Sequence, residues 1–288
     1  MSGNLGAVWV TGAGSGLGME SALVLASRGF RVFGSVLTGE EADVLTKAAA
    51  DRKVSVDILH TDVTRADQID VSLQNILAAT GKLDGVVQFA GMGLRGFIED
   101  LTLDEIRKVF DVNLFGMMAV TRAVLPVMRA ARHGRIILTS SVGGRMASMS
   151  IGGYASSKFA VEGFGECLRQ EMAPFNVHVS LLEPGLIHTP HFTVNRNRAK
   201  GAVDPASPYY AWFRRHEEIV DGILARNRFG APEVAKTVFQ ILTCRKPRLR
   251  YLVGVKAKLV VNLRRYLPGE SFERIYWAMV RRAVTRQG

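Results

Sequence analysis

Cysteine is scarce in this sequence, and its placement excludes two structural devices. The chain of 288 residues contains two cysteines, Cys167 and Cys244, which stand far apart and have no partner at metal-ligand spacing. Two such cysteines make neither a disulfide framework nor a metal site. We therefore expect no bound metal and a chain that folds in a reducing compartment such as the cytoplasm.

Long hydrophobic runs are also missing. No uninterrupted apolar stretch reaches the roughly 18 residues that a membrane-spanning helix needs, and the N-terminus has no basic segment before its first apolar run. The sequence therefore predicts neither a transmembrane helix nor a signal peptide. Because it also lacks repeats and a clear linker, and is 48% hydrophobic, we expect one large domain spanning residues 1–288.

Positive charge is concentrated at one end of the chain. The net charge is +11, and residues 245–288 carry twelve Lys and Arg against two acids, which leaves residues 1–244 at +1. A solvated surface would explain such an extension, and so would contact with an anionic membrane or with nucleic acid. Because the sequence has no recognisable nucleic-acid-binding motif, we expect no nucleic acid partner.

Part of this basic extension, residues 263–284, has the pattern of an amphipathic helix. Phe272, Ile275, Tyr276 and Met279 recur at helical spacing, with arginines elsewhere on the helical wheel. Such a helix can lie at a membrane interface, pack on its own domain, or pack on a second subunit. We favour packing and keep peripheral membrane association as the alternative.

Most of the chain alternates short apolar runs with amphipathic helices. We expect strands at 7–11, 30–37, 54–60, 83–90, 135–141, 177–183 and 250–253. Strands and helices that alternate at this spacing form right-handed crossovers and a parallel sheet. The sequence therefore predicts a single α/β domain: a Rossmann-like, doubly wound parallel sheet of about seven strands with helices on both faces. Thr102 with Glu105 predicts a capping box that opens a long helix through Asn113, and Thr64 with Asp67 resembles a second capping signature.

A glycine-rich loop, Thr11 to Gly18, joins the first strand to the first helix. Its glycines let the backbone approach a pyrophosphate, and the helix N-terminus offers free amides, so this loop predicts dinucleotide binding. The end of the second strand, residues 35–38, carries no charge that would select a ribose hydroxyl or a ribose phosphate. Glu40 and Glu41 follow and would repel a phosphate, so we favour NAD over NADP.

The stretch from Ser141 to Lys158 has the residues of a proton-transfer site. If this stretch is helical at its end, Tyr154 and Lys158 lie one turn apart on one face. A lysine ammonium beside a phenol should lower the pKa of the phenol and make it a usable general acid/base. The Ser141 hydroxyl, thirteen residues before Tyr154, can hold a carbonyl or alkoxide oxygen. Tyrosine and lysine also occur at this spacing on ordinary helix surfaces, so the other motifs must decide whether this pair is catalytic.

Residues 188–230 interrupt the alternation with an aromatic insertion. An apolar insertion beyond the carboxyl end of a strand is placed to cover a ligand, so we favour a substrate lid over a surface helix with its own small core. We thus divide the domain into a dinucleotide-binding and catalytic core (1–187), a substrate-covering insertion (188–230) and a basic C-terminal extension (245–288).

Taken together, these motifs resemble the short-chain dehydrogenase/reductase family over roughly residues 5–190. The motifs that carry the resemblance, in the family's order and spacing, are the loop Thr11–Gly18, Asp62, Asn113, Ser141, Tyr154, Lys158 and the turn from Pro184 to Thr189. Stretches such as SSVGGRMAS and GGYASSKFAVEGF are similar to the retinol dehydrogenase and 17β-hydroxysteroid dehydrogenase branch.

The resemblance implies a role for each matching residue. Tyr154 would exchange the proton, Ser141 would position the substrate oxygen, Lys158 would bind the nicotinamide ribose, and Asn113 would hold a relay water. Cofactor contacts are implied for Gly12, Ser15, Gly16, Leu17, Gly18, Asp62, Val63, Ala90, Tyr154, Lys158, Ile187 and Thr189. The substrate would contact Ser141, Met146, Tyr154 and Phe192. The family also implies a homodimer or homotetramer.

One departure from the family pattern concerns the loop after the fourth strand. The family usually has Asn-Ala-Gly where this chain has Phe89-Ala90-Gly91. An asparagine can hydrogen-bond neighbouring backbone and a phenylalanine cannot, so local hydrogen bonds are lost there or replaced by packing.

We therefore expect an NAD(P)-dependent oxidoreductase that interconverts an alcohol and a carbonyl on a bulky apolar substrate, such as a steroid or retinoid. The alternative is a non-catalytic, dinucleotide-sensing or scaffold protein that binds a partner or a membrane through its basic extension.

Overall fold

A parallel sheet of seven strands forms the centre of the protein in a computed structural model, which describes residues 5–187, 196–226, 229–268 and 270–285. The strand order is β3-β2-β1-β4-β5-β6-β7, and every pairing is parallel. The strands are β1 (Ala7–Thr11), β2 (Arg31–Val36), β3 (Asp57–His60), β4 (Gly85–Gln88), β5 (Gly134–Thr139), β6 (Val177–Pro184) and β7 (Arg250–Val253). This is the doubly wound topology that the alternating pattern predicts, and the prediction is confirmed.

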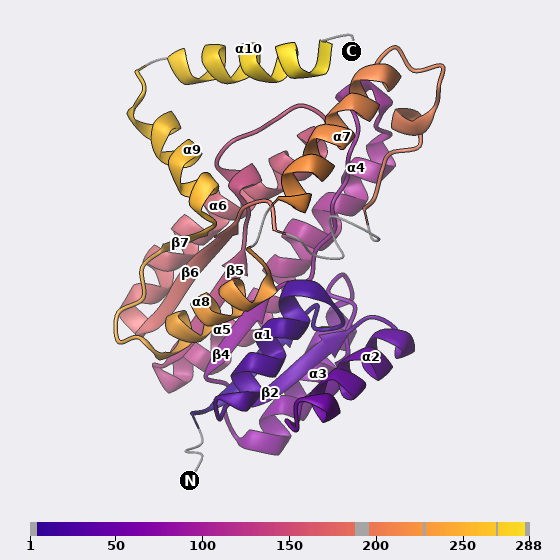
Figure 1. Cartoon of the computed structure of the whole chain (residues 1–288). Coiled ribbons are helices and arrows are strands. Elements are labelled where there is room, and N and C mark those ends of the chain that lie inside the picture. The colour runs from indigo at the N-terminus through magenta and orange to yellow at the C-terminus, as the bar shows by residue number, and fades with distance from the viewer. Residues whose placement is uncertain (1–4, 188–195, 227–228, 269, 286–288) are drawn as a thin grey trace.

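Helices cover both faces of the sheet (Figure 1). One face packs against α1 (Gly16–Ser27), α2 (Gly39–Asp51) and α8 (Ala231–Thr243). The other packs against α3 (Ala66–Thr80), α5 (Met117–Ala131) and α6 (Gly152–Met172). Side chains that alternate along β1 supply both cores: Trp9 faces one, while Val8 and Val10 face the other. A strand buried on both faces therefore appears in the sequence as a continuous apolar run.

The helix predicted to run through Asn113 is continuous but changes its winding. It consists of α4 (Leu103–Phe110), a π-helical turn (Asp111–Gly116) and α5, and the predicted capping box of Thr102 and Glu105 opens it. By length and composition, residues 103–131 are apolar enough to cross a membrane. In the fold, Val120, Val124 and Met128 of α5 are buried in the core beside the sheet.

The second predicted cap is wrong. Helix α3 begins at Ala66 with Arg65 as its N-cap residue, and no side chain caps it. Thr64 instead donates from its hydroxyl and its backbone amide to Asp62 Oδ1 (2.7 and 2.9 Å). Because Thr64 is hydrogen-bonded to Asp62, the chain makes a turn there before the helix starts.

The C-terminal extension folds back onto the domain as two helices. Figure 1 shows α9 (Val255–Tyr266) leading from β7 to α10 (Ser271–Thr285), beside α7 (Tyr210–Ala225). Phe272 is buried and stacks on Tyr276, whose hydroxyl donates to Ser148 Oγ (2.9 Å). Of the two kinds of packing that the sequence left open, these contacts show packing on the chain's own domain, and packing on a second subunit stays a prediction.

Candidate active site

A cleft opens where the strand order reverses between β1 and β4, at the carboxyl ends of the strands. Ligands of open α/β sheets bind at such a switch point. The cleft has a volume of about 380 Å³ and is lined by the glycine loop, the end of β2, the loop after β4, residues 139–141, and the pair Tyr154 and Lys158. The topology therefore brings together segments that are far apart in the sequence.

The glycine loop is shaped for close approach of backbone to a ligand. Gly12 has φ of +67°, and a Cβ on Gly18 would lie 2.0 Å from the carbonyl oxygen of Gly12. No side chain caps α1 at its N-cap residue Ser15, so the first amides of the helix face the cleft without a side-chain partner there. Free amides at a helix N-terminus bind phosphate groups. The loop therefore fits the pyrophosphate of a dinucleotide.

Two buried hydroxyls at the other end of the cleft also fit a polar ligand. Thr139 Oγ1 and Ser140 Oγ are buried and, within the described part of the chain, have no hydrogen-bond partner. Both residues line the cleft beside Tyr154 and Lys158. Buried hydroxyls normally have a hydrogen-bond partner. The ribose and carboxamide of a nicotinamide nucleotide carry groups that could supply these missing partners.

The remaining residues predicted to contact the cofactor divide into three groups. Gly12, Ser15, Gly16, Leu17, Gly18, Asp62, Val63 and Ala90 line the cleft. The side chain of Ile187 is instead buried in the core between the sheet and α8, and Ile187 is not among the residues that line the cleft. Thr189 lies outside the described residues.

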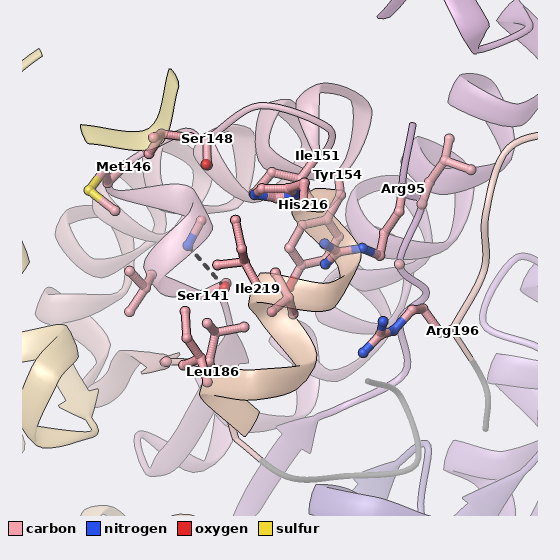
Figure 2. Close-up of a pocket in the computed structure, with 18 of the residues that line it drawn as sticks. Arg95, Ser141, Met146, Ser148, Ile151, Tyr154, Leu186, Arg196, His216 and Ile219 are labelled. Carbon is pink, nitrogen blue, oxygen red and sulfur yellow. Dashed lines mark hydrogen bonds between the residues drawn. The ribbon is translucent and has the colours of Figure 1, made fainter. Parts of the chain in front are cut away.

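Ser141, Tyr154 and Lys158 meet at the inner end of this cleft. Tyr154 and Lys158 share one face of α6, and Lys158 Nζ lies 5.9 Å from the centre of the Tyr154 ring. The Lys158 ammonium donates to the backbone oxygen of Thr139 (2.9 Å). Ser141 follows β5, accepts a hydrogen bond from the Gly143 amide (3.0 Å; Figure 2) and is hydrogen-bonded to Tyr154.

The predicted lowering of the Tyr154 pKa is wrong for this arrangement. Burial raises the pKa of Tyr154 above its usual 10, and the hydrogen bond with Ser141 opposes that rise only in part. Burial also lowers the pKa of Lys158 to about 8. Both groups are shifted for the same reason, because an apolar surrounding disfavours whichever form is charged. The phenol is therefore held protonated at neutral pH.

Asn113 lies in the π-helical turn, and its side chain fastens the loop after β4. Its Oδ1 accepts from the Met92 amide (2.8 Å), and its Nδ2 donates to the Met92 carbonyl (2.9 Å) and to Ser157 Oγ (3.1 Å). Phe89 packs partly buried against the core on the α1 side of the sheet. Phe89 thus contributes packing where the family has an asparagine, and Asn113 holds the same loop through its hydrogen bonds to Met92.

A second cavity, of about 450 Å³, adjoins the cleft and shares Ser141, Tyr154 and Gly185 with it (Figure 2). Its walls come from the loop after β4, from residues 141–151, from α7 and from α10. The apolar lining includes Leu94, Val142, Met146, Ile151, Leu186, Ile219, Val220, Ile223, Met279 and Val280. Met146 therefore lies where a substrate contact was predicted, and Phe192 lies outside the described residues.

The aromatic insertion contributes both to a small separate core and to the wall of the second cavity, and its role as a substrate lid stays a prediction. Tyr209 stacks on Phe97 (4.7 Å between ring centres), and Phe213 is buried in a small separate core. The following turns of α7 carry His216, Ile219, Val220 and Ile223 into the wall of the second cavity. The first half of α7 thus packs into a small separate core, and the second half forms part of the cavity wall.

Sequence reasoning missed several residues of this second cavity. Arg95 and His216 belong to no motif, and they come together because Arg95 pairs with Glu217, the neighbour of His216 on α7. Tyr276, Met279 and Val280 of α10 were recognised only as the apolar face of a helix. The periodicity of that face signals burial, but it gives no indication of the surface that the helix covers.

Comparison with known proteins agrees with this fold. Residues 6–200 match the short chain dehydrogenase family. Mouse (Mus musculus) retinol dehydrogenase 5 is 34% identical over 96% of this chain and 89% of its own length. The 3-ketodihydrosphingosine reductase of Bacteroides thetaiotaomicron is 32% identical over 94% of this chain and 98% of its own length.

Solved structures show the same architecture. A short-chain dehydrogenase/reductase from Burkholderia phymatum in complex with NAD superposes with a TM-score of 0.80 at 25% identity, covering 92% of this chain and 94% of that one. Actinorhodin polyketide ketoreductase with NADPH has a TM-score of 0.72 at 27% identity, covering 86% and 95%. The chain belongs to the short-chain dehydrogenase/reductase family. It is an NAD(P)-dependent oxidoreductase, similar to the retinol dehydrogenase branch of that family.

Proposed function

We propose that this enzyme interconverts an alcohol and a carbonyl on a bulky apolar substrate of steroid or retinoid type, with Tyr154 as general acid/base. The observation that carries the proposal is the junction of two cavities. The dinucleotide cleft and the apolar cavity share Ser141, Tyr154 and Gly185. A substrate in one cavity and a cofactor in the other would meet at the Tyr154 hydroxyl.

The chemistry divides between the cofactor and the chain. A bound nicotinamide supplies or accepts the hydride. Tyr154 is protonated at neutral pH because burial raises its pKa, so it is ready to donate to a carbonyl oxygen in the direction of reduction. Ser141, held by the Gly143 amide, would keep that oxygen within reach of the phenol.

Lys158 and Asn113 would serve the proton path and the cofactor. The Lys158 ammonium reaches the Thr139 carbonyl and the floor of the cleft, where it would hold the nicotinamide ribose. Gly91 lies between the two residues: a Cβ there would stand 3.1 Å from Asn113 Oδ1 and 3.8 Å from Lys158 Nζ. That spacing supports a water-sized path from Asn113 to Lys158.

We propose NAD as the preferred cofactor. Glu41 lines the cleft, and its Oε2 accepts a hydrogen bond from the Leu37 amide (2.7 Å) at the end of β2. A carboxylate at this position favours a free ribose hydroxyl and repels a phosphate. Lys108 also lines the cleft, and its positive charge would attract a phosphate. The preference for NAD over NADP therefore depends on the Glu41 carboxylate.

The apolar substrate is supported by the second cavity and by the relatives' names. One relative is a retinol dehydrogenase and another is a 3-ketodihydrosphingosine reductase. Following NADH absorbance with a panel of apolar alcohols and ketones tests the proposal. Turnover confined to small polar alcohols would contradict the substrate class, and binding of NADH without any turnover would favour the non-catalytic alternative.

Substituting Tyr154→Phe tests the assigned residue. We expect kcat to fall about 100-fold or more, because the proton donor is removed, while NADH affinity stays near that of the wild type. Tyr266→Phe is the matched control, since Tyr266 is 76% exposed on α9. Near-normal turnover by the Tyr154→Phe variant would overturn the role of Tyr154.

A further inference from the structure

A cluster of charged residues, some of them buried, lies beside the apolar cavity, and Arg95 and Arg196 of this cluster line it. Arg95, from the loop after β4, and Glu217, from α7, are 6% and 7% exposed, and Arg95 Nε donates to Glu217 Oε1. Arg196 Nη1 and Arg198 Nε both donate to Glu217 Oε2 (3.0 and 2.9 Å). The Glu217 carboxylate therefore accepts hydrogen bonds from three guanidinium groups.

The cluster has more positive than negative charge. Asp221 is its second acid and pairs with Arg196, so three arginines face two carboxylates. His216 lies beside them and accepts or donates at Nδ1 to Ser150 Oγ (2.7 Å). Burial lowers the pKa of His216 to about 4, so it adds no charge at neutral pH. The cluster therefore has a net charge of +1, and two of its arginines, Arg95 and Arg196, line the cavity.

Arg95 also has unused hydrogen-bonding capacity. Its Nη2 is buried and has no hydrogen-bond partner among the residues that the structure describes. Arg95 lines the cavity, and Figure 2 shows its side chain extending towards His216, whose pKa is lowered by burial and by the charge of Arg95. A charged N–H group buried without a partner is costly, so such a group in a ligand cavity indicates a ligand acceptor.

We propose that Arg95 binds a carboxylate carried by the apolar substrate. This rests on the proposed function and narrows its substrate class to hydroxy or oxo acids with a long apolar body. The carboxylate would accept from Arg95 Nη2 and offset the excess positive charge of the cluster. The apolar body would lie along Ile219, Val220 and Met279, and its carbinol or carbonyl would reach Tyr154.

The test compares matched substrates. We would measure kcat/KM for long-chain keto acids with the ketone at successive positions, for their methyl esters, and for ketones without the carboxyl group. A charge-assisted hydrogen bond predicts that the best acid exceeds its ester by about tenfold or more, mainly through KM. Equal kcat/KM for acids and esters at every ketone position would overturn the inference and leave the oxidoreductase proposal intact.

Substitutions separate binding from folding. Arg95→Gln alone would leave Glu217 with less compensation, so we would combine Arg95→Gln with Glu217→Gln and confirm the fold by circular dichroism and NADH binding. This double variant should lose the preference for acids, so that kcat/KM for the best acid falls to the level of its ester. Arg215→Gln with Glu218→Gln removes an exposed ion pair from the same helix and should change neither. An acid preference that survives in the folded Arg95 variant would contradict the inference.

Calorimetry gives a readout that is independent of turnover. A long-chain alkanoate, kept below its micelle concentration, should bind the wild type about tenfold more tightly than the matching alcohol and lose this advantage in the double variant. If the alkanoate has that advantage but no alcohol or ketone is turned over, the proposed function fails and the carboxylate site stands. If the alkanoate binds no better than the alcohol, the carboxylate site is wrong.

Discussion

Lys158 illustrates how burial sets the chemistry of single residues in this protein. It is 4% exposed, and among the residues that the structure describes its ammonium group donates to the Thr139 carbonyl, which carries no full charge. An ammonium group in such a place is destabilised relative to water, and its pKa falls to about 8. A charged ligand group above the cleft floor would therefore interact with Lys158 more strongly than with a solvated lysine.

The buried lysine makes stability depend on pH in a defined direction. Its folded pKa, about 8, lies below the ordinary 10.5, so between these values the unfolded chain binds more protons. Relative to Lys158→Met, the free energy of unfolding of the wild type should rise from pH 8 to pH 10.5 by up to about 3 kcal/mol. Urea denaturation of both proteins across this range measures the difference. A difference that does not vary with pH would show that Lys158 is not titrating there.

Glu41 provides a residue-scale test of cofactor choice. We expect Glu41→Gln to improve NADP affinity and to leave NAD affinity less changed, because it removes the carboxylate beside Leu37. Fluorescence titration with NADH and NADPH measures both affinities. Glu40→Gln serves as the control, since Glu40 is on the same turn of α2 and does not line the cleft. Tighter NADPH than NADH binding in the wild type would contradict the NAD preference.

At the scale of the element, the cleft is formed by the loops and turns at the carboxyl end of the sheet. The β1–α1 loop, the loop after β4, the π-helical turn and the start of α6 each place one wall of the cleft. A π-helical turn shifts the register of a helix and is frequent at functional sites. Here it turns Asn113 towards Met92 and fixes the loop that faces the cofactor.

The glycine loop can be tested by a single methyl group. A Cβ at Gly18 would stand 2.0 Å from the Gly12 carbonyl oxygen, so the backbone of the loop would have to move. We expect Gly18→Ala to lose most NADH binding and to lower the melting temperature. Gly163→Ala is the matched control, because Gly163 lies in α6 with nothing within 4 Å of its added Cβ. It should be neutral or stabilise by up to about 1 kcal/mol. Unchanged NADH binding by Gly18→Ala would argue against a pyrophosphate at this loop.

At the scale of the whole molecule, the C-terminal helices have two sides. One side of α10 closes the apolar cavity, and the other exposes Ile275 and Trp277, which are 60% and 54% exposed. The same two helices carry exposed cationic residues, namely Lys258, Arg265, Arg274, Arg281 and Arg282. Apolar side chains flanked by basic ones fit an anionic membrane surface, and we propose that α9 and α10 make peripheral contact there.

Vesicle binding tests that proposal. The protein should sediment with vesicles that contain phosphatidylserine, less with neutral vesicles, and less at high salt. Replacing Ile275 and Trp277 by Ser should weaken the binding, while Val71→Ser, at an exposed site on α3, should not. No binding to anionic vesicles would contradict membrane contact. If the Ile275 and Trp277 variant instead dissociates a dimer in light scattering, this face packs on a second copy.

Oligomer formation stays a prediction at the same scale. Phe115 and Phe159 are 57% and 41% exposed on the helices around Asn113 and after Tyr154, where we expect subunits to meet. Light scattering of the wild type should give a multiple of the chain mass, and Phe115→Glu should reduce it. A monomeric wild type would contradict this expectation.

The sequence by itself determined the order of strands and helices, the capping box at Thr102, the glycine loop and the spacing of Ser141, Tyr154 and Lys158. These features are local: periodicity, caps and turns depend on residues a few positions apart. The sequence also located the first strand at residues 7–11 and the last at 250–253, as the structure has them.

Only the tertiary structure decided what depends on distant contacts. Arg95 and Glu217 are 122 residues apart in sequence and belong to no motif, so nothing local indicates that they pair. The pKa directions of Tyr154 and Lys158 depend on how completely the fold removes water around them, which spacing does not show. The position of α10 over the cavity likewise depends on which surface its apolar face covers.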